Sequence, residues 1–208
     1  MRRHKVERGV LAVSYANRLA LVKAYGGLDP AQPLPLASLA KAITGACVAT
    51  LVRDRKLSFE TRLGDVLGPF FRRHGAPADP RVAAITIEQL LAHRSGFSRK
   101  ANPDPASGVA LVAHLREYGS REAHITEAAK RALTYRLARP PGHAYEYVNA
   151  NYLLLGAVIE QTTGRDYESY CREAVLKPLG VASGKLGKWA ALSSYGGWSL
   201  SAAEYLAF

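Results

Sequence analysis

The chain has 208 residues, 48% of them hydrophobic and 22% charged. These proportions are typical of a globular protein of one domain or slightly more, large enough to bury a core. Its formal charge of +11 would suit a nucleic acid or an anionic surface. The basic residues are spread along the sequence without a basic stripe or a nucleic-acid motif, so we expect no nucleic-acid partner. No apolar run reaches the roughly 18 residues that a membrane span needs.

The first 25 residues predict a β-hairpin. A basic head followed by an apolar run resembles a secretory signal, but Asn17 and Arg18 interrupt the run and no small-residue cleavage site follows. We therefore expect no signal peptide and, for the chain as it stands, a cytoplasmic location. Residues 9–25 are apolar on both sides of Ala16-Asn17, which is typical of two strands joined by a short turn.

A loop rich in glycine and proline leads to an apolar helix. The stretch "PLASLAKAITGACVATLVRD", residues 35–54, has Lys41 as its only charge between Ser38 and Val52. No face of this helix is polar, so we expect it to be buried all round and to end near residues 53–56. Cys47 lies in it and Cys171 in a later helical stretch; two cysteines define no disulfide framework, and we expect buried free thiols.

Helices dominate the rest of the chain. In "TIEQLLAHRSGF", Thr86 and Gln89 have the spacing of a capping box and Gly96 is a stop signal, which predicts a short helix from about Ile87 to Arg94. Further helices are expected over about 109–118 and 125–137, from the Tyr-Val-Asn segment to Gly164, and from Asp166 to about Leu176. Ser201 and Glu204 open a last helix of under two turns. Because so short a helix and an isolated hairpin are each marginally stable, we expect strands that these residues lack.

Lys41 is the first candidate for chemistry. A buried lysine must be paired or lose its proton, because desolvation disfavours its charged form. Ser38 lies three positions earlier, on the same helical face, so a nucleophile would stand beside a possible base. The alternative is a serine that caps the helix and a lysine that extends to the surface.

Tyr147 and Asn149 in "YEYVNANY" are the second pair of candidates. A tyrosine acts as a base only where a nearby cation stabilises its phenolate, and Lys41 would supply that cation. An asparagine offers a donor and an acceptor, which suits a substrate amide. The alternative is an aromatic residue that covers the core and an asparagine that caps a helix.

Together these motifs resemble the serine β-lactamase and penicillin-binding-protein family, in the branch of class C β-lactamases, DD-peptidases and related esterases. Four segments in order carry the resemblance, which covers nearly the whole chain: "LASLAKAITGA", "ITIEQLLAHRSGF", the Tyr-x-Asn region and "GGWSLSAAEYLAF". The resemblance implies an α/β fold, with an antiparallel sheet domain and an all-helical domain. This chain would be mostly α-helical with one N-terminal hairpin, its sheet incomplete.

The resemblance also implies site roles. Ser38 would be the acylated nucleophile, Lys41 its activating partner, Tyr147 the proton shuttle and Asn149 the residue that binds the substrate amide. The substrate would be a β-lactam, a D-Ala-D-Ala peptide of peptidoglycan or an ester, with no metal or organic cofactor. His93 would be a hydrogen-bonded structural residue. Many relatives are periplasmic or secreted, and the oligomeric state stays open.

The sequence departs from the family in one motif. Relatives carry Lys-Thr-Gly or His-x-Gly on a strand that lines the site, and no such triplet follows Asn149. The resemblance thus implies that the C-terminal part is missing: residues 1–37 would belong to the sheet domain and 38–208 to the helical domain. Either the chain is part of a longer enzyme, or it is a shortened relative that binds without turnover or folds poorly.

Overall fold

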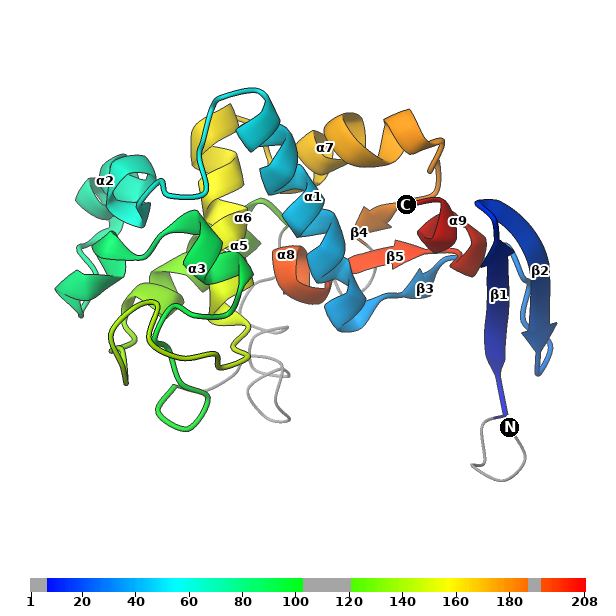
Figure 1. Ribbon diagram of the computed structural model, residues 1–208, viewed down its shortest axis with the longest axis horizontal. Coiled ribbons are helices and arrows are strands. Elements are labelled where there is room, and N and C mark those ends of the chain that lie inside the picture. Colours follow the sequence, from blue (N-terminus) through cyan, green and yellow to red (C-terminus); the bar gives the residue numbers. More distant parts are fainter. Residues whose placement is uncertain (1–6, 103–120, 187–191) are drawn as a thin grey trace.

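The computed structural model describes residues 7–102, 121–186 and 192–208 (Figure 1). The helix expected over 109–118 lies outside these ranges. In the described part no helix is long and apolar enough to cross a membrane. In chain order, the strands (β), α-helices (α) and 3₁₀ or π-helical turns (η) are β1 (Gly9–Tyr15), β2 (Arg18–Tyr25), β3 (Leu34–Pro35), η2 (Ala37–Leu39), α1 (Ala40–Arg53), α2 (Leu63–His74), η3 (Pro80–Ala84), α3 (Ile87–Leu91), α5 (Arg121–Leu133), α6 (Ala150–Thr163), α7 (Tyr167–Cys171), η4 (Arg172–Leu176), η5 (Lys177–Leu179), β4 (Lys185–Leu186), α8 (Ser193–Gly196), β5 (Trp198–Leu200) and α9 (Ala202–Ala207).

The predicted hairpin is confirmed. β1 and β2 pair antiparallel around Ala16 and Asn17, whose φ angles of 49° and 58° match the type of turn that follows the twist of hairpin strands. The hairpin stands at one end of the molecule, with α9 beside it (Figure 1). No residue of its strands is buried, and Leu11, Val13, Leu19 and Leu21 are each exposed by 40% or more. The mostly helical fold with an incomplete sheet is thus as expected.

Helix α6 is the centre of the helical part. Ten consecutive residues, Ala150–Ile159, are buried, because α1, α2, α3, α5, α7 and α8 all pack around them. The helix ends at Gly164, whose φ of 65° places it in the left-handed region that glycine adopts without strain. The position of this stop agrees with the sequence prediction.

A second small sheet was not expected from the sequence. Its order is β3-β5-β4, and all pairs are antiparallel. Strands of two or three residues carry no readable alternation, and β3 includes Pro35, so the pattern gives no strand signal. The backbone N–H of Leu36 donates to the carbonyl of Trp198, which holds the segment that precedes Ser38 next to β5.

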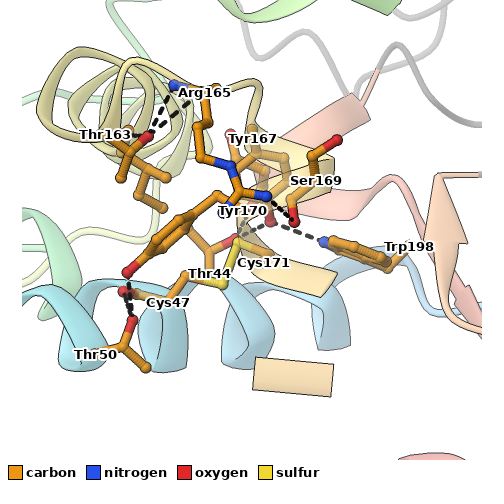
Figure 2. The surroundings of a disulfide bond; sticks show 12 residues. Thr44, Cys47, Thr50, Thr163, Arg165, Tyr167, Ser169, Tyr170, Cys171 and Trp198 are labelled. Carbon is orange, nitrogen blue, oxygen red and sulfur yellow. Dashed lines mark hydrogen bonds between the residues drawn. A yellow bond between two sulfur atoms is a disulfide. The ribbon is translucent and has the colours of Figure 1, made fainter. Parts of the chain in front are cut away.

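Helix α1 differs from its prediction in two ways. It is not buried all round, since Ala42 and Ala49 are exposed. Its cysteine is not a free thiol: Cys47 forms a disulfide with Cys171 at the end of α7 (Figure 2). The two cysteines are 124 residues apart, and only the packing of α1 against α7 brings them together.

Hydrogen bonds flank this disulfide on both sides (Figure 2). Thr44 contacts the Tyr167 hydroxyl at 2.6 Å, and Thr50 contacts the Tyr170 hydroxyl at 2.8 Å. The indole N–H of Trp198 also donates to the Tyr167 hydroxyl, at 2.8 Å. Helix α1 is therefore fixed along one side to α7, and α7 is in turn bonded to β5.

Candidate active site

Ser38 lies in the short 3₁₀ turn η2 just before α1, with its side chain exposed. The preceding Ala37 has a φ of 47°, a conformation that residues with a side chain seldom adopt. Neither η2 nor α1 has a side-chain hydrogen bond at its N-cap, and the N-cap residues are Leu36 and Leu39. The alternative of a capping serine is therefore wrong, and the Ser38 hydroxyl is turned to other partners.

Lys41 does not extend to the surface. The residue is 6% exposed, and its Nζ donates to the Ser38 Oγ at 3.3 Å and to the Tyr195 carbonyl at 2.9 Å. The expected contact between serine and lysine is therefore present. The carbonyl comes from α8, 154 residues further along the chain, and no sequence pattern pointed to it.

Three tyrosine rings surround the ammonium of Lys41. Its Nζ lies 5.0 Å from the ring centre of Tyr147, 5.6 Å from that of Tyr152 and 5.4 Å from that of Tyr195. Ring faces attract a cation within about 6 Å, so these rings favour the charged form of the buried lysine. Burial raises the pKa of Tyr152, which keeps that phenol protonated at neutral pH.

Tyr147 also contacts Ser38. Its hydroxyl donates to the Ser38 Oγ at 2.8 Å, across 109 residues of sequence. Ser38, Lys41 and Tyr147 are thus brought together in one cluster. Asn149 follows two residues later and is buried at the start of α6, 3% exposed. It holds the N-cap position, but its side chain makes no capping hydrogen bond.

His93 packs against Tyr147 and forms hydrogen bonds with the residues next to it. The Nδ1 of His93 accepts from the backbone N–H of Val148 at 3.3 Å and faces the side-chain amide of Asn151 at 3.0 Å. Burial and the charge of Lys41 lower the pKa of His93 to about 4, so the ring is neutral at physiological pH. The expectation of a hydrogen-bonded histidine agrees with these contacts, whereas the helix before it ends at Leu91, earlier than predicted.

This arrangement places a hydroxyl beside two groups that could take part in moving its proton. The exposed Ser38 hydroxyl lies within hydrogen-bond reach of the Tyr147 phenol and the Lys41 ammonium, and this ammonium lies over the ring of Tyr147. A phenolate formed at Tyr147 would be stabilised by that positive charge. Among the described residues no cluster of three or more His, Cys, Asp or Glu side chains could hold a metal ion.

Sequence reasoning missed the contributions of α8 and of two tyrosines. The Tyr195 carbonyl offers no residue-type signal, because any residue has a carbonyl. Tyr152 and Tyr195 look like ordinary core aromatics in the sequence, and both are buried. Only the fold shows that their rings face Lys41.

Known proteins are similar to this chain in sequence or in fold. A fimbrial assembly protein FimD (serogroup D) of Dichelobacter nodosus is 33% identical over 147 residues, which are 70% of this chain and 34% of that protein. A protein described as a β-lactamase from Bacteroides dorei superposes on all of this chain and 58% of its own length, with a TM-score of 0.78 and 23% identity.

An octameric penicillin-binding protein homologue from Pyrococcus abyssi covers all of this chain and 52% of its own length, with a TM-score of 0.77 and 18% identity. The chain therefore spans about a third of the curated relative and just over half of each solved structure. Residues 1–203 match the β-lactamase family, and the chain belongs to that family.

Proposed function

We propose that the chain carries the nucleophile half of a serine hydrolase site that works through an acyl-serine intermediate. The Ser38 Oγ attacks a carbonyl carbon, and a C–O bond forms as the C–N bond of a β-lactam or D-Ala-D-Ala peptide, or the C–O bond of an ester, breaks. The serine proton passes through Tyr147 to the leaving group. Water then attacks the acyl-serine and releases the acid.

One observation carries this proposal: the Ser38 Oγ is contacted by both the Lys41 Nζ and the Tyr147 hydroxyl. In the attacking state Tyr147 would be ionised and would accept the proton over the same short distance, while Lys41 balances its charge. Asn149, buried at the start of α6, would bind the substrate amide. Membership of the β-lactamase family supports a hydrolase of this kind.

The test is an intact mass spectrum before and after exposure to a penicillin and, separately, to an activated ester. We expect a mass increase equal to the acyl group in the wild-type chain and none in Ser38→Ala. Ser58→Ala, which changes an exposed serine outside the cluster, should be acylated like the wild type. Equal labelling of wild type and Ser38→Ala would refute the assignment of the nucleophile.

The second candidate is that these 208 residues bind ligand without turnover. It is favoured by the absence of Lys-Thr-Gly or His-x-Gly after Asn149. The family resemblance implies that the strand with this triplet supplies one of two backbone N–H groups of the oxyanion hole. Loss of a single oxyanion donor costs on the order of a hundredfold to a thousandfold in rate. A folded wild-type chain that takes up no acyl group and releases no product would support this second candidate.

A further inference from the structure

We propose that His93 is a positioning residue that fixes Tyr147 against Ser38. This inference rests on the proposed function, because it concerns the placement of the proposed proton shuttle. His93 lies just after α3, and Tyr147 lies in the segment that leads into α6. Their ring centres are 4.5 Å apart, with an angle of 36° between the ring planes.

His93 holds the residues on both sides of Tyr147. Its backbone carbonyl accepts from the N–H of Glu146 at 2.8 Å, and its Nδ1 accepts from the N–H of Val148 at 3.3 Å. His93 itself is fixed by a bond from its N–H to the Leu90 carbonyl at 3.1 Å. Tyr147 is thus held between two anchored neighbours and against the imidazole ring, which limits how far its hydroxyl can move.

The hydrogen bonds define which nitrogen carries the proton. The Val148 N–H can only donate, so Nδ1 must be the acceptor, and the ring proton must be on Nε2. The same choice places the NH₂ of Asn151, a fully buried residue of α6, toward Nδ1. The Asn151 NH₂ can donate to Nδ1 in the same tautomer that accepts from Val148.

A protonated His93 could not perform this role. Its Nδ1–H would face the donors of Val148 and Asn151, and its charge would face the ammonium of Lys41. The other ionisable groups that face the ring are the phenols of Tyr145, Tyr147 and Tyr152. The site therefore requires the neutral imidazole.

The test compares His93→Phe with His143→Phe, a matched change at an exposed histidine in the turn that precedes the tyrosine segment. The readout is the rate of Ser38 acylation by an activated ester as a function of ester concentration. We expect His93→Phe to slow the maximal rate by about a hundredfold, the scale of a misplaced catalytic group, with little change in the half-saturating concentration. His93→Asn has a side-chain oxygen that can accept a hydrogen bond in place of Nδ1. We expect its maximal rate to be at least about tenfold higher than that of His93→Phe.

A second readout does not depend on acylation. In the wild-type chain, ¹⁵N NMR of the histidine rings should show one histidine with its proton on Nε2 and an accepting Nδ1. Hydrogen exchange at the Val148 amide should be at least tenfold faster in His93→Phe than in His143→Phe. If the wild-type chain is not acylated, the proposed function fails, and the exchange rates still decide the role of His93. A proton on Nδ1, or unchanged exchange at Val148 in His93→Phe, would overturn the inference.

Discussion

The ammonium of Lys41 lies 2.9 Å from the carbonyl oxygen of Tyr195 in α8. The same short helix is tied to α1 by the Thr44 hydroxyl, which donates to the Ser194 carbonyl at 2.6 Å. On its other side α8 packs against α6 at Gly156. The position of α8 between these helices therefore sets where the Lys41 side chain ends.

Gly156→Ala should displace α8. A β-carbon at Gly156 would lie 2.5 Å from the Ser194 Oγ and 3.0 Å from the Ile125 Cδ1, closer than packed atoms allow. Overpacking of this kind costs about 1–3 kcal/mol. Alanine is favoured over glycine inside a helix by at most roughly 1 kcal/mol, so the cost of overpacking should dominate. We expect a lower free energy of unfolding in urea and slower acylation of Ser38.

Gly45→Ala is the matched control for this substitution. Gly45 also lies inside a helix, α1, but a β-carbon there would meet only the Leu91 Cδ2, at the ordinary contact distance of 3.9 Å. This variant should be more stable by up to about 1 kcal/mol and acylate normally. Equal effects of the two substitutions would contradict the packing argument.

Lys41→Met should slow the acylation of Ser38 without unfolding the protein. Methionine has a similar length and suits a buried position. Its introduction removes the cost of burying a charge together with the hydrogen bond to the Tyr195 carbonyl, so the two effects on stability oppose each other. The phenolate of Tyr147 would lose its cation, so we expect acylation to slow by about 10² to 10⁴-fold with a near-native melting temperature. Time-resolved mass spectrometry and thermal denaturation measure the two effects.

Lys23→Met is the control for this variant. Its Nζ lies 5.3 Å from the ring centre of Tyr25 in the hairpin, a similar contact between lysine and tyrosine outside the cluster of Ser38, Lys41 and Tyr147. Acylation should be unchanged in this variant. Fast acylation in Lys41→Met would show that Lys41 is not needed to activate the serine.

The Cys47–Cys171 disulfide should contribute to stability. It closes a loop across 124 residues, and cross-links of that span restrict the unfolded chain strongly. We expect a reducing agent to lower the free energy of unfolding of the wild type by roughly 2–4 kcal/mol. The double variant Cys47→Ala/Cys171→Ala should not respond to the reductant. Two free thiols in the unreduced protein would contradict the assignment.

Local signals in the sequence predicted local structure well. The capping boxes at Thr86 and Ser201 are both present, with Gln89 and Glu204 as the reciprocal partners. Such interactions span three residues, so the sequence contains all of their partners. The contact between Ser38 and Lys41 was predictable for the same reason.

Contacts over long sequence distances were not predictable in this way. The Tyr147 hydroxyl reaches Ser38 across 109 residues, and only the family resemblance linked the two in advance. The disulfide and the Tyr195 carbonyl had no such guide, because they depend on how α1 packs against α7 and α8. Packing of this kind is a property of the assembled core and leaves no local pattern.

Glu160 lies near the C-terminal end of α6, and its carboxylate accepts from the backbone N–H of Tyr167 at 3.0 Å. Burial raises the pKa of Glu160 to about 7, and the negative charge of Asp166 adds to this effect. In the unfolded chain a glutamate has a pKa near 4.3. Between these two values the folded protein binds more protons than the unfolded chain, so stability falls as the pH rises from about 4.5 to 7.

Glu160→Gln should remove this loss of folding stability at higher pH. Glutamine keeps an oxygen that can accept from the Tyr167 N–H but never takes a negative charge. We expect the variant to be more stable than the wild type by roughly 2 kcal/mol at pH 8, and to differ little from it at pH 4.5. Glu173→Gln, at an exposed glutamate paired with Lys177, should change stability by well under 1 kcal/mol at either pH. Urea unfolding at the two pH values gives the comparison, and a Glu160→Gln variant with no gain at pH 8 would show that the Glu160 carboxylate is well solvated in the folded protein.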